Sequence, residues 1–88
     1  MSPETREQAN VVEGIVQAIK PHLHGNPPEI ISVVLSDLIA TFIAGFPAGS
    51  RDDMLNALID STRGLIHINE MLMFGYGGHP ADRGGTRQ

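Results

Sequence analysis

Residues 30–46 read IISVVLSDLIATFIAGF, and Asp37 is the only charged residue in this stretch. A helix with so few charges has to be covered by other helices, by a second copy of the chain or by lipid. Asn26 precedes it as a cap, followed by prolines and by a glutamate three residues after the cap. Pro47 and Gly49 interrupt the chain after it. The sequence therefore predicts a helix over residues 27–45.

Projecting this helix at about 100° per residue separates two faces. One face is a wide arc of bulky side chains: Ile31, Leu35, Leu38, Phe42 and Phe46, flanked by Val34 and Ile39. The other face is a ridge of small side chains four residues apart: Ser32, Ser36, Ala40 and Ala44. Small residues let two helices approach closely. We expect helices of the same chain to cover the bulky arc and a second backbone to dock on the small ridge.

Two further helices flank this one. Ser2 and Pro3 suit a helix start, and an apolar stripe follows them until Pro21, which predicts a helix over residues 3–20 with a possible extra turn to Leu23. Ser50, with acidic residues in the first turn after it, predicts a helix over residues 51–74 that Gly75 ends. Gly64 lies inside that helix and indicates close approach by another backbone.

The chain is therefore predicted to be all-α, with one helical domain over residues 1–74 and a flexible, glycine-rich tail over residues 75–88. The protein has 88 residues, of which 41% are hydrophobic and only 18% are charged. Soluble domains usually carry about 25% charged residues. A low charge fraction on a small chain indicates that a partner covers part of the surface.

A second copy of the chain is the simplest cover, and we expect a homodimeric helical bundle. The predicted third helix is the longest, so its last turns would extend beyond an up-down-up bundle and expose apolar side chains. Asn69 lies within the apolar face and either fixes the register of the dimer or bonds a loop carbonyl of its own chain. The interface residues expected at this end are Asn69, Met71, Leu72, Met73 and Phe74.

Composition argues against several classes of protein. The net charge is −4, and the acidic body of the chain disfavours nucleic-acid binding. Asp37 and the neighbouring hydroxyl residues disfavour a membrane span over residues 30–46. The polar start does not resemble a secretory signal, and the absence of cysteine removes disulfides and thiolate metal sites. We expect a cytoplasmic protein.

Histidine is the only residue type that hints at a chemical site. His22 and His24 lie two apart in a predicted loop, and His67 and Glu70 lie three apart on the polar side of the third helix. Imidazole and carboxylate groups are common ligands of zinc and iron. A metal site built from these four residues is the weaker alternative, and we expect no cofactor and no catalytic residue.

Two functions are consistent with these features. The first is a small, non-catalytic protein–protein interaction or regulatory module that acts as a helical homodimer and presents the end of its third helix to a protein partner. Its size and short capped helices resemble those of many bacterial and phage accessory proteins. The alternative is a helical protein that binds a metal or small ligand through His67 and Glu70 with the loop histidines.

Overall fold

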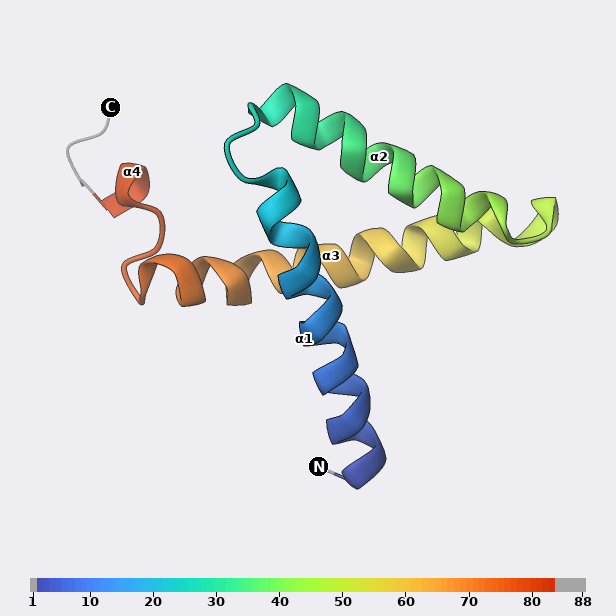
Figure 1. Ribbon diagram of the computed structural model, residues 1–88, viewed down its shortest axis with the longest axis horizontal. Helices are drawn as coiled ribbons and strands as arrows, with labels where there is room; N and C mark the ends of the chain where they lie inside the picture. Colours follow the sequence, from blue (N-terminus) through green and yellow to red (C-terminus); the bar gives the residue numbers. More distant parts are fainter. Residues whose placement is uncertain (1, 84–88) are drawn as a thin grey trace. The chain divides into compact units, whose positions relative to one another are not determined.

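The computed structural model describes residues 2–83, and all the regular elements in that range are helical (Figure 1). In chain order they are α1 (Pro3–Leu23), α2 (Pro28–Ala44), the short 3-10 helix η1 (Ala48–Ser50), α3 (Arg51–Phe74) and the single turn α4 (Pro80–Arg83). This confirms the all-α class, and α3 has the predicted bounds. The contacts group the chain into two units, Met1–Ala40 and Thr41–Gln88.

In the first unit, α1 begins as predicted and ends three residues later than residue 20. The Ser2 hydroxyl accepts a hydrogen bond from the Thr5 amide at 3.2 Å, and Pro3 occupies the first turn. Pro21 lies inside the helix. Proline removes only one backbone donor, and a single further turn follows it before His24 adopts an extended conformation. The possible extra turn to Leu23 is therefore present in α1.

Asn26 does not have its predicted role as the cap of α2. Its side-chain amide instead donates to the carbonyl of His22 at 3.1 Å, and its backbone N–H donates to the carbonyl of Leu23. Both carbonyls belong to the last turn of α1, where four carbonyls lack a partner within the helix. The Pro27 carbonyl accepts the first hydrogen bonds of α2, which starts at Pro28 rather than residue 27. Asn26 therefore stabilises the end of α1.

In the second unit, Arg51 fixes the corner between α2 and α3. Its Nε donates to the Phe46 carbonyl at 2.9 Å, and its Nη2 donates to the Ala44 carbonyl at 3.1 Å. The rings of Phe42 and Phe46 meet edge to face at the same corner, with centroids 5.2 Å apart. A cation in the first turn of α3 is unfavourable for the α3 dipole, but this guanidinium reaches the carbonyl end of α2, where a cation is favourable.

Ser50 precedes α3 as predicted, but its side chain does not cap the helix. The hydroxyl donates to the Pro47 carbonyl at 3.2 Å and so closes the 3-10 turn before α3. Asp52 and Asp53 still lie in the first turn, where their charges complement the helix dipole. The start of α3 is thus stabilised by electrostatics and by the Arg51 corner rather than by a side-chain cap.

No side chain of the described residues is buried. The bulky arc of α2 was expected to be covered by its own chain, yet Leu38 is 53% exposed and Phe42 is 50% exposed. On α3, Met54, Leu55 and Leu58 beside the corner are half-buried, whereas Leu72 is 79% exposed. A single chain therefore leaves most of its apolar side chains in contact with water.

Candidate functional site

The chain reverses direction after α3 through a glycine-rich turn, here called the C-terminal turn and comprising residues 75–83. The Gly75 amide donates to the Met71 carbonyl at 2.8 Å and ends the helix, as predicted. Gly75 has φ of +80° and Gly78 has φ of +72°, conformations that side chains with a Cβ rarely adopt. The Gly78 amide donates to the Gly75 carbonyl at 3.0 Å, which closes the turn.

Glu70 holds this turn against the side of α3. Its Oε2 accepts a hydrogen bond from the His79 amide at 2.9 Å. A Cβ at Gly78 would lie 3.0 Å from the same Oε2 atom, so glycine leaves the space that the carboxylate occupies. Glu70 is half-buried, unlike most polar residues of α3. The three-residue spacing between His67 and Glu70 suggested a pair of metal ligands. In the structure, the Glu70 carboxylate instead binds the backbone amide of His79, nine residues later.

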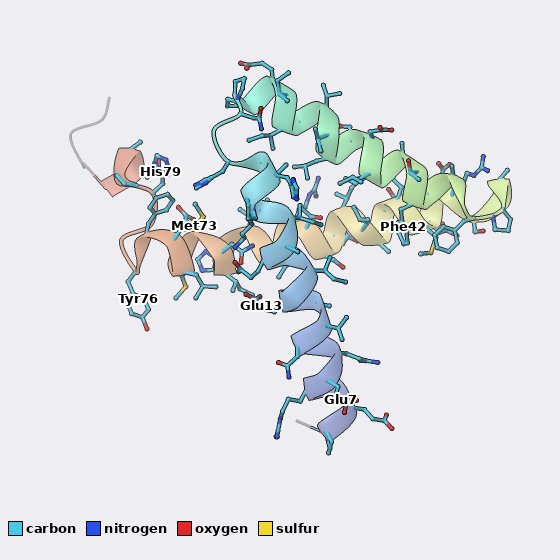
Figure 2. All side chains as sticks on the ribbon, viewed as in Figure 1. Glu7, Glu13, Phe42, Met73, Tyr76 and His79 are labelled. Carbon is cyan, nitrogen blue, oxygen red and sulfur yellow. The ribbon has the colours of Figure 1, made fainter. Side chains whose placement is uncertain are left out.

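The His79 side chain contributes to the same arrangement. Its ring meets the Phe74 ring at an interplanar angle of 68°, with centroids 5.0 Å apart. Its Nδ1 accepts a hydrogen bond from the Ala81 amide at 3.0 Å at the start of α4. Figure 2 shows His79 and Tyr76 on opposite sides of the end of α3, with Tyr76 pointing away from the helix. Sequence analysis missed His79, although its glycine-rich surroundings marked a turn.

The sequence predicted a flexible tail over residues 75–88, and the structure differs from this prediction in one respect. Residues 75–83 contact Glu70 and Phe74, so part of the segment packs against α3. Residues 84–88 lie outside the described range. The flexibility of the tail and the division at residue 74 stay predictions.

Replacing Gly78 with alanine is expected to release the C-terminal turn from α3. The new Cβ would meet the Glu70 carboxylate in a backbone conformation that alanine disfavours by about 1–2 kcal/mol. Hydrogen exchange of the His79 amide, measured by NMR, should then be about tenfold faster or more. Gly49→Ala is the matched control, because no atom lies within 4 Å of its Cβ position and its φ is not positive. Unchanged exchange in Gly78→Ala would contradict the role of Glu70.

The four residues of the metal hypothesis lie on two different units. His22 and His24 are exposed at the end of α1, and His67 is exposed on α3 one turn before Glu70. Among the described residues, no three histidine, aspartate or glutamate side chains are arranged to hold a metal ion.

The predicted interface residues are almost all accessible. The small ridge of α2, which consists of Ser32, Ser36, Ala40 and Ala44, is exposed along its length. At the end of α3, Leu72 and Met73 are 79% and 71% exposed, and Phe74 is half-buried by the C-terminal turn. Asn69 is exposed, and its side chain makes no hydrogen bond to other described residues. The alternative in which Asn69 bonds a loop carbonyl of its own chain is therefore not observed.

A shallow depression also occurs on α1, and it is lined by Glu4, Glu7, Gln8, Val11 and Val12. All of these residues belong to one helix, as Glu7 and Glu13 along the same helix illustrate in Figure 2. The carboxylates of Glu4 and Glu7 are thus on an open helix surface. The depression continues the apolar stripe of α1, in which Val12 is 60% exposed.

Within residues 2–83, no helix is both long and apolar enough to span a bilayer. No family model, curated protein or solved structure matches this chain.

Proposed function

We propose that this protein is a small, non-catalytic interaction or regulatory module that acts as a helical homodimer. The observation that carries the proposal is the absence of any buried side chain among the described residues, in a sequence that is 41% hydrophobic. Burial of apolar surface is the main favourable contribution to folding. A chain that buries so little alone needs a second surface to cover its helices.

The proposed partner surface is the end of α3 with the C-terminal turn. Met73 is 71% exposed and Tyr76 is 96% exposed in the single chain, so both side chains are accessible to a partner. Methionine adapts its shape to different partners, and tyrosine combines an apolar ring with a polar tip. The absence of cysteine fits a reducing compartment, and we place the module in the cytoplasm on that ground.

Light scattering on the purified chain tests the dimer. We expect a mass of twice 9.5 kDa at tens of micromolar. The same run should be repeated at high salt, because pairing through apolar surface is not weakened by screening. A mass that falls to one chain only at high salt would indicate an electrostatic assembly instead.

A further inference from the structure

His79 directly precedes α4 and caps it with its side chain. The amide of Ala81, the second residue of α4, donates to the His79 Nδ1 at 3.0 Å. The His79 carbonyl accepts a hydrogen bond from the Asp82 amide at 2.9 Å. Serine, threonine, aspartate and asparagine usually occupy this position, because their side-chain oxygens accept from the second or third amide of the helix. A histidine cap differs from these, because its acceptor is a nitrogen that binds a proton near neutral pH.

The hydrogen bond from Ala81 requires a neutral His79 ring. A histidine Nδ1 accepts a hydrogen bond only when it carries no proton, so the proton of the capping ring is on Nε2. A proton on Nδ1 would set two N–H groups against each other at the 3.0 Å separation of these nitrogens. It would also place a positive charge at the amide end of α4, where a cation is unfavourable. The capped turn is therefore incompatible with a protonated ring.

The same histidine ties the C-terminal turn to α3. Its amide donates to the Glu70 carboxylate at 2.9 Å, and its ring meets the Phe74 ring with centroids 5.0 Å apart. A ring that rotates away from the Ala81 amide also leaves the Phe74 ring. Loss of the cap therefore weakens the packing that keeps Phe74 half-buried.

The charged and titratable side chains described around His79 come from α3, the turn and α4. Glu70 binds its amide from α3, and Asp82 follows it in α4. Attraction to these carboxylates opposes release of a protonated ring, but ion pairs at accessible positions contribute little. His67 is exposed one turn before Glu70, and Tyr76 points away on the opposite side of the end of α3 (Figure 2). The loss of the acceptor at Nδ1 therefore sets the direction of the response to acid.

Resting on the proposed function, in which the end of α3 is the partner surface, we propose that His79 closes the C-terminal turn near neutral pH and releases it in acid. At pH 8 the neutral ring caps α4, and the turn covers Phe74. At pH 5 the protonated ring leaves the cap, and Phe74 joins Met73 as accessible apolar surface. Because the closed turn binds only the neutral ring, acid favours the open turn. Loss of one such hydrogen bond shifts the opening equilibrium about fivefold.

NMR on the full chain at pH 5 and at pH 8 tests this response, because histidine changes its charge between these values. Long-range proton–nitrogen correlations identify the protonated ring nitrogen, and we expect a proton on Nε2 alone at pH 8. The protection factor of the His79 amide, corrected for the intrinsic pH dependence of exchange, should be about fivefold lower at pH 5. A proton on Nδ1 at pH 8, or equal protection factors at the two pH values, would overturn the inference.

Two variants assign the pH dependence to one residue. His79→Asn keeps a cap acceptor without a titrating ring, because asparagine bonds the amide two residues later. Its protection factor at residue 79 should differ by less than about twofold between pH 5 and pH 8, since a pH-independent cap leaves the turn closed at both. His67→Asn is the matched control and should keep the full change. A response that persists in His79→Asn, or disappears in His67→Asn, would contradict the assignment to His79.

Light scattering on the same samples separates this inference from the proposed function. A single-chain mass at pH 8 with the full change in protection would overturn the homodimer and leave the role of His79 standing, because Glu70, Phe74 and His79 contact one another within one chain. A dimeric mass with equal protection factors would overturn the role of His79 and leave the homodimer standing.

Discussion

Replacing Leu65 and Leu72 together with aspartate should convert the dimer into single chains. Both positions lie on the apolar face of α3, where Leu65 is 52% and Leu72 is 79% exposed. A dimer that covers this face would bury two unpaired charges per chain in the variant. An uncompensated buried charge costs about 3–5 kcal/mol, and about 1.4 kcal/mol corresponds to a tenfold change in affinity. We therefore expect the dissociation constant to rise at least 100-fold, as measured by analytical ultracentrifugation over a concentration series.

Ile66→Asp is the matched control for this prediction. Ile66 is 60% exposed on the same helix, but it lies about 100° away from Leu65 around the helix axis. The control makes the same kind of substitution, and we expect its dissociation constant to stay within a few-fold of the natural chain. Equal weakening by both variants would show that loss of helix stability, rather than loss of the contacts of Leu65 and Leu72, causes dissociation. Helical content by circular dichroism distinguishes these two causes directly.

Replacing Arg51 with alanine is expected to destabilise the corner between α2 and α3. The change removes both hydrogen bonds from the guanidinium to the carbonyls of Phe46 and Ala44. Hydrogen bonds from a charged donor at an accessible site contribute about 1–2 kcal/mol together, and the carbonyl end of α2 loses its cation. The urea midpoint of unfolding should fall accordingly, at a protein concentration held fixed because association stabilises the folded state.

Arg63→Ala provides the comparison for Arg51. Both substitutions remove one guanidinium from the same helix, but Arg63 has no hydrogen bond to the end of α2. We expect its urea midpoint to shift by less than a third of the shift in Arg51→Ala. Arg51→Lys should lie between the two, because an ammonium group can reach one carbonyl but lacks the planar fork that reaches two. Equal midpoints for Arg51→Ala and Arg63→Ala would contradict the corner.

The helices of this protein are predictable because strong local signals mark them. Pro3 at the start of α1, the prolines before α2 and Gly75 after α3 each act through the backbone of their own neighbourhood. The caps were less predictable. Asn26 and Ser50 each have a choice of nearby backbone partners, and both bond to carbonyls that precede them rather than to the helix that follows.

The C-terminal turn could not be predicted from spacing alone. Glu70 and His79 are nine residues apart, and the bond between them depends on the conformations of Gly75 and Gly78. The glycines were visible in the sequence, but a short glycine-rich segment with few apolar residues resembles a flexible tail.

The mass of the natural chain in solution tests the central claim most directly. Light scattering after gel filtration, at concentrations from about 5 to about 100 micromolar, should give twice 9.5 kDa at the upper end of this range. Helical content should be measured on the same samples, so that a folded dimer is distinguished from an aggregate. A monodisperse, helical species of 9.5 kDa throughout the range would contradict the account, because the chain would then cover its own apolar helices without a second copy.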